Sequence, residues 1–415
     1  MFFTMRQKPL AVIFLTVLVD LIGVGILIPV MPQLLANPDS PHYLLSGAVA
    51  SGRGFVLLGA LTAIYPLMSF LAAPILGQLS DRYGRRKVLA VCLAGTSIGY
   101  SLFAVAILLK SIPLLFLSRI LDGITGGNIS VAQAAVADVS KPEDRAKNFG
   151  MIGAAFGLGF ILGPFIGGKL ADSSFVSWFN ATTPFWFAAI LAALNFASVM
   201  LFFPETRKLD PVTKVFNWLR SLGDIGRAWR WKELRSLFIT GFLFYSGFSF
   251  FVSFFNVYLT DRFGFTEGRI GEYFAYIGFF IVLAQAFLIR VVSKRWSESH
   301  ILRVSMLGTA FSVFSMLLVR EAWQLFLIPP LMAASNGLTV ASLSATVSKT
   351  AGPDRQGEIL GLNASIQSLS NALPPLLAGF VAARLTPEAP IAIGALICLS
   401  AWIMFGLTTR AAKGV

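Results

Sequence analysis

Long apolar runs, separated by short polar segments, dominate this chain. About 20 consecutive apolar residues are enough for an α-helix to cross the hydrocarbon core of a bilayer. The pattern predicts twelve such helices, over residues 9–35, 55–79, 87–109, 112–139, 147–171, 182–204, 236–260, 270–292, 300–319, 323–347, 356–384 and 387–408. We therefore expect an all-α polytopic membrane protein.

Lys and Arg residues in the connecting segments predict the orientation. If the N-terminus is cytoplasmic, the cytoplasmic segments hold 25 of the 33 Lys and Arg residues and the outer loops hold 7, and Arg119 lies inside a helix. Cytoplasmic loops of membrane proteins carry such an excess. Both termini are therefore expected in the cytoplasm. The net charge of +13 is explained as a topology signal, and no nucleic-acid partner is expected.

The composition changes this picture little. The chain is 56% hydrophobic and 13% charged, whereas an ordinary soluble domain is about a quarter charged. Its two cysteines lie in apolar runs and its two histidines lie in predicted loops. We see no cluster of nucleophile, base or metal ligands. The sequence therefore predicts neither an enzyme, nor a metal site, nor a bound cofactor.

The chain divides into two related halves. We expect an N-terminal six-helix bundle over 1–204, a cytoplasmic linker over 205–235 and a C-terminal six-helix bundle over 236–415. Asp144-Arg145 and Asp354-Arg355 follow corresponding helices, 210 residues apart. Two halves with a substrate site between them are typical of transporters. The linker is either an amphipathic helix on the membrane surface or a solvated tether.

The loop after the second predicted helix reads "GQLSDRYGRRKVL". Glycine permits tight turns and close helix approach, and an aspartate can face a helix N-terminus. This segment closely resembles the loop signature of the major facilitator superfamily. The resemblance implies a gating loop made of Gly77, Asp81, Arg82, Gly84, Arg85 and Arg86, and two pseudo-symmetric six-helix bundles in the major facilitator fold.

Three further motifs narrow the resemblance: "DLIGVGILIPVMP", "SRILDGITGG" and "GFILGPFIGG". Together they resemble the twelve-helix drug:proton antiporters, most closely the tetracycline-exporter branch. In the third motif, glycines at four-residue spacing let helices pack closely, and a proline bends the helix. In the family this motif accompanies antiport; otherwise it is a kinked packing helix. Its residues are Gly159, Gly163, Pro164, Gly167 and Gly168.

The sequence also departs from the family. The second-half loop "RVVSKRWSESH" has Lys294 at the position that corresponds to Asp81. The gating latch is therefore expected in the first half only. Ile281 occupies the position at which the tetracycline exporters have a histidine. This departure counts against a metal–tetracycline substrate but not against an exporter.

Asp20 lies about 16 Å into the first predicted helix, close to the middle of the membrane. Placing a charge there costs roughly 3 kcal/mol, which favours the protonated form. We expect Asp20 to bind and release a proton as the coupling carboxyl. The alternatives are a permanently neutral, hydrogen-bonded aspartate and a substrate-binding group.

Arg119 and Asp122 share one face of the fourth predicted helix because they are three residues apart. By resemblance Arg119 takes part in proton coupling, whereas Asp122 is either a second protonation site or the structural partner of Arg119. Arg119 could exchange between Asp20 and Asp122. At the end of this helix, Asp138 either pairs with Arg85 or is a solvated helix end, and Asp81 would face the start of the helix at 356. That latch would favour the outward-open state.

By resemblance, the first, fourth, seventh and tenth helices line a central cavity. Polar side chains at helical spacing predict its substrate-contacting residues, among many phenylalanines that otherwise face lipid or pack helices. These candidates are Gln133, Tyr245, Ser249, Asn256, Asn336 and Thr339. Aromatic walls with scattered polar groups suit an amphipathic small molecule.

We therefore expect a proton-coupled antiporter that exports a hydrophobic or amphipathic, drug-like or tetracycline-like molecule by alternating access. The alternatives are export of an endogenous metabolite or lipid-like compound, and a proton symporter of the same fold. Its expected partners are lipid, protons and a small-molecule substrate, with the proton gradient as the driving force. We expect a monomer in the bacterial cytoplasmic (inner) membrane.

Overall fold

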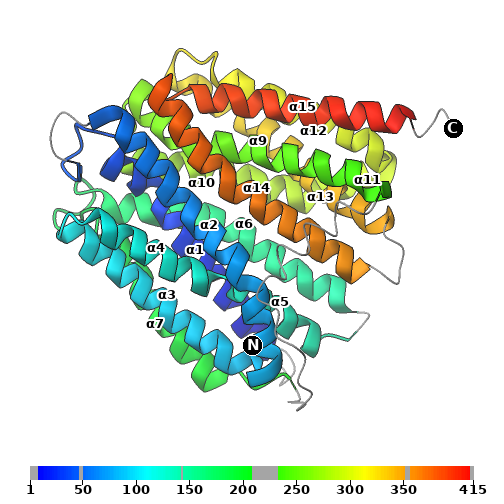
Figure 1. Cartoon of the computed structure of the whole chain (residues 1–415), viewed down its shortest axis with the longest axis horizontal. Coiled ribbons are helices and arrows are strands. Elements are labelled where there is room, and N and C mark those ends of the chain that lie inside the picture. Colours follow the sequence, from blue (N-terminus) through cyan, green and yellow to red (C-terminus); the bar gives the residue numbers. More distant parts are fainter. Residues whose placement is uncertain (1–7, 46–49, 142–143, 208–231, 351–355, 412–415) are drawn as a thin grey trace.

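The computed structural model describes residues 8–45, 50–141, 144–207, 232–350 and 356–411. It consists of two helical bundles, as expected, with no strand in the described ranges (Figure 1). The N-terminal half consists of α1 (Lys8–Leu35), α2 (Ala50–Tyr83), α3 (Arg85–Leu108), α4 (Ile112–Gly126), α5 (Asn128–Val139), α6 (Arg145–Ala171) and α7 (Thr183–Phe202).

The C-terminal half repeats this arrangement. Its helices are α9 (Lys232–Phe263), α10 (Glu267–Leu283), the π-helical turn η2 (Ala284–Leu288), α11 (Ile289–Arg295), α12 (Glu298–Met316), the 3₁₀ segment η3 (Ala322–Leu327), α13 (Pro329–Thr350), α14 (Gln356–Arg384) and α15 (Ala389–Ala411). Helix α9 begins four residues before the boundary expected at 236. The expected linker helix lies mostly at 208–231, outside the described residues.

Two predicted helices are interrupted. The span expected over 112–139 breaks at Gly127, where a Cβ atom would lie 2.9 Å from a Leu76 methyl carbon and 3.0 Å from the Ala73 nitrogen of α2. Glycine therefore lets the fourth span approach α2 closely. The span expected over 270–292 is interrupted by the π-helical turn η2. Such turns occur as single insertions within α-helices.

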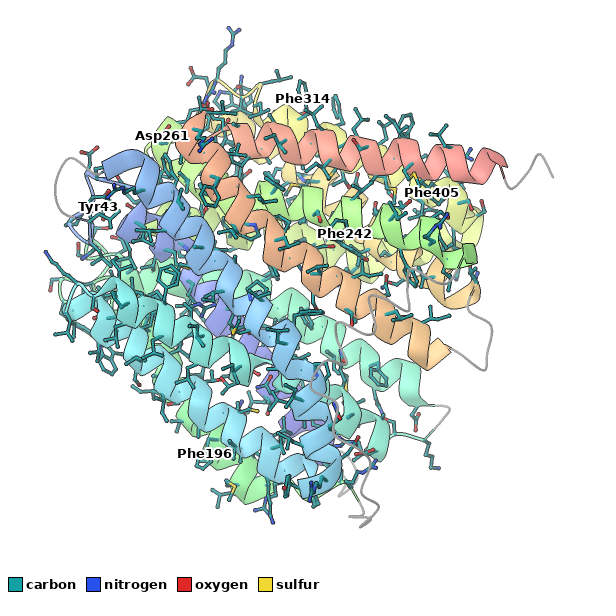
Figure 2. All side chains as sticks on the ribbon, in the orientation of Figure 1. Tyr43, Phe196, Phe242, Asp261, Phe314 and Phe405 are labelled. Atoms are coloured by element: carbon teal, nitrogen blue, oxygen red, sulfur yellow. The ribbon has the colours of Figure 1, made fainter. Side chains whose placement is uncertain are left out.

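Membrane-spanning character is clear for most of the fold. Nine helices within the described ranges are long and apolar enough to cross a bilayer. The interrupted spans and α12, which carries charged residues in its first turns, account for the other three of the twelve predicted. Large apolar side chains such as Phe314, 48% exposed, lie on the outer surface (Figure 2). Such a surface suits contact with lipid.

Paired glycines bring the two halves together. Gly168 of α6 contacts Gly271 of α10, and Gly379 of α14 contacts Gly59 of α2. A Cβ atom on Gly271 would lie 2.6 Å from the Pro164 carbonyl oxygen, and one on Gly379 would lie 2.6 Å from the Phe55 carbonyl oxygen. Corresponding members of the two contacts are offset by nearly the same number of residues, 211 from Gly168 to Gly379 and 212 from Gly59 to Gly271. The two contacts, hereafter the glycine clasps, are therefore related by the pseudo-symmetry of the fold.

Both clasps lie toward the end of the bundle opposite the termini. There, Asn256 Nδ2 also donates a 2.6 Å hydrogen bond to the Ile28 carbonyl oxygen, and the rings of Phe55 and Phe254 lie 6.2 Å apart. From this end the helices of the two halves diverge toward the end that carries the chain termini (Figure 1). The structure is therefore closed between the halves at the end opposite the termini.

Candidate functional site

Among the side chains that the structure describes, buried charge lies in the N-terminal half. Among the described residues classed as buried, the charged ones are Asp20, Arg85, Arg119 and Asp122. Ionisable groups inside a membrane protein are expensive and mark functional sites. Three of them form the proton-coupling set predicted from the sequence, and the fourth belongs to the predicted gating loop.

Asp20 lies in the interior of α1 and is 6% exposed. Its Oδ2 accepts a 2.6 Å hydrogen bond from Asn128 Nδ2, whereas its Oδ1 is buried and has no hydrogen-bond partner. Asn128 is the first residue of α5, directly after the break at Gly127. The sequence reasoning missed Asn128. Its position directly after the glycine pair that ends "SRILDGITGG" was the available signal.

Arg119 and Asp122 form an ion pair on α4, with 2.5 Å between Arg119 Nη1 and Asp122 Oδ2. The ring of Tyr65 on α2 covers the guanidinium, with its centroid 4.5 Å from Cζ. Gly123 and Gly126 make room for Tyr65, since a Cβ atom at either position would overlap it. In this arrangement Arg119 pairs with Asp122, and Asp20 is held by an amide. Sequence reasoning identified the pair but not the tyrosine.

Helix α6 packs against α1 through the predicted antiporter motif. A Cβ atom on Gly163 would lie 2.7 Å from the Gly25 Cα atom, and one on Gly167 2.5 Å from the Ile26 carbonyl oxygen. Gly159 contacts Leu21, the neighbour of Asp20. Glycines at these positions are what such close packing requires. The α6 helix therefore touches α1 directly beside the buried carboxyl.

A different face of α6 borders an apolar pocket of about 420 Å³ between the halves. Phe156, Gly157 and Phe160 of α6 line it on one side, and α9, α10, η2, α11 and α13 supply the remaining residues. Ile281, at the family's histidine position, is among them, as is Gln285 of the π-helical turn. This pocket is the candidate substrate site.

Asn336 is the one predicted cavity residue that lines this pocket. Thr339 is fully buried and donates a 2.8 Å hydrogen bond to Ser305 Oγ, so it joins α13 to α12. Asn256 bonds the Ile28 backbone, and Tyr245 packs in the apolar cluster with Phe244.

Ser249 is buried on α9, and Gln133 is exposed on α5; neither lines the pocket. The polar stripe pattern therefore placed one of its six candidates, Asn336, in the wall of this pocket. Thr339 and Asn256 bond to neighbouring helices instead, as polar groups in an apolar interior do where a partner is within reach.

Arg85 is the centre of the gating loop. Its Nε lies 3.0 Å from Asp138 Oδ2, the pair that the sequence predicted, and its Nη2 lies 2.8 Å from Asp81 Oδ1. Gly84 has φ of +97°, so the turn before Arg85 requires glycine. Asp81 also pairs with Arg207 at 3.5 Å, whereas the side chains at the start of α14 lie outside the described residues.

The structure also places Gly77, Arg82 and Arg86 of the gating loop. A Cβ atom on Gly77 would meet nothing within 4 Å, so the expected close helix approach is absent at this residue. Arg82 lies over the ring of its neighbour Tyr83. Arg86 donates to the Met200 carbonyl oxygen at the end of α7.

Glu205, which the sequence reasoning did not single out, caps α3. Its carboxylate accepts hydrogen bonds from the backbone nitrogens of Arg85, at 2.8 Å, and Arg86, at 3.2 Å. A carboxylate at a helix N-terminus satisfies free N–H groups and the helix dipole. The segment 202–206, which reads "FFPET", held the signal, because a glutamate lies three residues after the last residue of α7. The gating loop is therefore anchored on α7.

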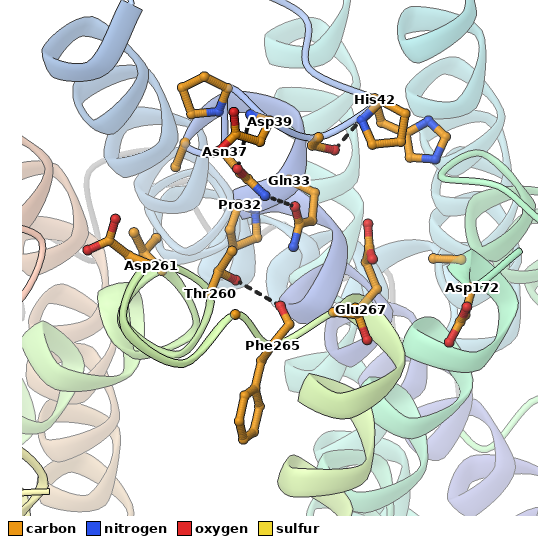
Figure 3. A pocket seen from close by; sticks show the side chains of 18 of the residues that line it. Pro32, Gln33, Asn37, Asp39, His42, Asp172, Thr260, Asp261, Phe265 and Glu267 are labelled. Carbon is orange, nitrogen blue, oxygen red and sulfur yellow. Dashed lines mark hydrogen bonds between the residues drawn. The ribbon is translucent and has the colours of Figure 1, made fainter. Parts of the chain in front are cut away.

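A second cavity, of about 510 Å³, opens at the end of the bundle opposite the termini (Figure 3). Asp39, Asp172, Asp261 and Glu267 line it, and none of the predicted site residues does. Burial raises the pKa of Glu267, and the charge of Asp172 adds to this effect. The cavity therefore places acidic groups of both halves next to the α6–α10 clasp.

Comparison with known proteins agrees with this architecture. The family model for the Major Facilitator Superfamily matches residues 13–375 and 237–414. The chain is 33% identical over 381 residues to the class C tetracycline resistance protein of Escherichia coli, with 89% of each chain covered. It is 30% identical over 360 residues to the class B protein of the same organism, covering 87% of this chain and 85% of the other. The crystal structure of the human organic anion transporter MFSD10 (TETRAN) has a TM-score of 0.70 at 24% identity, covering 96% of this chain and 99% of that one.

Proposed function

The chain belongs to the major facilitator superfamily of transporters, and we propose that it is a proton-coupled antiporter that exports a hydrophobic or amphipathic small molecule. The observation that carries the proposal is the buried Asp20 carboxyl, which has a free oxygen and an amide, not a cation, as its partner. A carboxyl group in that setting is neutralised most simply by a proton.

Helix α6 provides the link between proton and substrate. It contacts Leu21 through Gly159 on one side and lines the apolar pocket through Phe160 on the other. Because packed helices shift as units, a change at Asp20 that moves α1 also moves the pocket wall. Protonation of Asp20 and binding of substrate in the pocket would then both change the position of α6.

The glycine clasps support alternating access. They hold the halves together at one end while the helices of the two halves diverge toward the other end, as expected of one of the two states that the mechanism needs. If both termini are cytoplasmic, this arrangement would correspond to the inward-open state, although the Arg85–Asp138 pair of the gating loop is formed. Substrate would enter the pocket from the cytoplasmic side, and the clasps would separate for its release.

The relatives named for tetracycline resistance favour efflux of a drug-like molecule over export of an endogenous metabolite or lipid-like compound. The glycine motif of α6 favours antiport over symport, since in the resembling family it accompanies antiport. We propose a monomer in the bacterial inner membrane, driven by the proton gradient without a bound cofactor.

The test is proton-driven transport in inverted membrane vesicles, combined with a growth-inhibition panel of toxic compounds. Wild type should raise resistance to at least one compound, and an imposed proton gradient should drive its uptake into the vesicles. Asp20→Asn should lower the driven rate by about 100-fold or more, since it removes the proton site. Asp261→Asn, the same change at an exposed aspartate that lines the second cavity, is the matched control. Driven uptake that survives unchanged in Asp20→Asn would refute the proposal.

A further inference from the structure

The apolar pocket between α6 and the C-terminal half has walls of unusual chemical uniformity. Its 19 lining residues include six phenylalanines and no ionisable side chain. Only two of them, Gln285 and Asn336, carry a polar side chain, and both are amides. Asn336 Oδ1 is buried and has no hydrogen-bond partner in the described structure.

From this wall we infer that the pocket selects uncharged, largely aromatic molecules that carry one hydrogen-bonding group for Asn336. The inference rests on the proposed function, because it names the substrate class of the same site. A charged ligand would lose its hydration with no opposite charge in the wall to replace it. The pocket therefore excludes organic anions and cations alike, and it requires no bound metal ion.

Asn336 accounts for the requirement that the ligand carry a hydrogen-bonding group. A buried amide atom without a partner costs free energy, and a ligand group that bonds to it recovers that cost. Ile281, on the opposing helix, provides only an apolar surface where a histidine would offer a charge or a metal ligand. Selection by one amide in an aromatic wall distinguishes molecules by charge first and by a single hydrogen bond second.

Gly337 allows the site to be blocked without rebuilding it. It lines the pocket, and a Cβ atom added there would meet nothing within 4 Å. A tryptophan at this position would therefore project into open space and fill the pocket. Gly153 of α6 is the matched control, because a Cβ atom there also meets nothing within 4 Å and the residue does not line the pocket.

The experiment is equilibrium binding of fluorescent probes to the purified full chain in lipid nanodiscs, with empty nanodiscs as background. N-phenyl-1-naphthylamine is uncharged and has one N–H group. Anilinonaphthalene sulfonate adds a sulfonate to that skeleton, and ethidium is a cation. The neutral probe should bind at least about 10-fold more tightly than either charged probe, because charge burial is unfavourable. Gly337→Trp should abolish its binding and Gly153→Trp should not.

The hydrogen bond is tested with Asn336→Leu. This variant should bind N-phenyl-1-naphthylamine about 3- to 10-fold more weakly, the usual worth of one hydrogen bond. Its affinity for 1-benzylnaphthalene, in which CH₂ replaces N–H, should be unchanged when measured by displacement. Addition of Mg²⁺ or a chelator should have no effect. Equal losses for the two compounds would overturn the role of Asn336.

Tighter binding of a charged probe, abolished by Gly337→Trp, would overturn the charge selection. Binding needs no proton gradient, so the result separates this inference from the proposed function. Neutral-probe binding that persists while proton-driven transport is absent would refute antiport alone. Proton-driven transport restricted to charged compounds would refute this inference alone.

Discussion

The two halves share one architecture and differ in their interiors. In the N-terminal half, α1 and α4 bury Asp20, Arg119 and Asp122 among glycines and tyrosines. In the C-terminal half the buried polar residues in the described ranges are uncharged, and α9, α10 and α13 contribute most of an apolar pocket. The helical arrangement is repeated, but the described buried charges lie in one half, and the other half contributes most of the wall of the candidate substrate pocket.

The contacts between the two halves, unlike their interiors, are alike. The clasps of α6 with α10 and of α2 with α14 use glycines at equivalent positions and the same carbonyl contacts. Backbone packing depends only on shape, so both halves can use the same contact. Proton and substrate binding need different side chains, so the two halves can differ there.

Removing a buried charge from the N-terminal half should have the largest effect on stability and transport. Arg119→Met leaves Asp122 buried without its cation, which should cost about 3–5 kcal/mol of stability. The double variant Arg119→Met/Asp122→Leu removes both charges and should recover most of this loss while transport stays impaired. Thermal unfolding in detergent measures the stability, and vesicle uptake measures the transport. A double variant as unstable as the single one would show that the pair has no such role.

Disrupting either glycine clasp should have the next largest effect, on the distance between the two halves. Gly59→Leu and Gly271→Leu each place a side chain against the backbone of the partner helix, so each should shift the population at least about 10-fold toward separation at that end. Spin-label distances across the end opposite the termini measure the shift. Gly153→Leu should leave them unchanged. If only one of the two clasp variants responds, the clasps are not equivalent.

The cap of α3 sharpens the difference between the gating loops. Glu205→Gln weakens two backbone hydrogen bonds at the α3 N-terminus and should cost about 1 kcal/mol of stability. The corresponding helix of the second half, α12, begins after Ser297 without a side-chain cap bond. Ser297→Ala should therefore change the unfolding temperature much less. Equal effects of the two substitutions would contradict this asymmetry.

The smallest expected effect concerns pH at the α6–α10 clasp. The pKa of Glu267 is raised by burial and by Asp172, so its protonated form stabilises the closed arrangement. That stabilisation is present at low pH and is lost as the pH rises through the raised pKa. Asp39, Asp261 and His42 line the same cavity.

Lys169 pairs with Glu272 at 2.5 Å beside the same clasp. Spin-label distances should therefore report more opening at high pH in the wild type and a weaker pH dependence in Glu267→Gln. Asp261→Asn, in the same cavity, is the control. A pH response that survives fully in Glu267→Gln would assign the titration to another group.

Much of the molecule followed from the sequence. Apolar run lengths predicted every span to within a few residues, and the repeat of Asp-Arg pairs predicted two halves. Three-residue spacing predicted the Arg119–Asp122 pair, since residues three apart share a helix face. These features depend on one helix, or on one short loop, at a time.

Contacts between distant segments were decided only in the tertiary structure. The break at Gly127, which carries Asn128 to Asp20, arises because the fourth span packs against α2. Thr339 bonds Ser305 while Asn336 reaches the pocket, although both lie on α13. A helical wheel shows which side chains share a face but not which neighbour the face meets. Sequence thus determined the helices and their charges, and packing determined which polar atoms found partners and which stayed free.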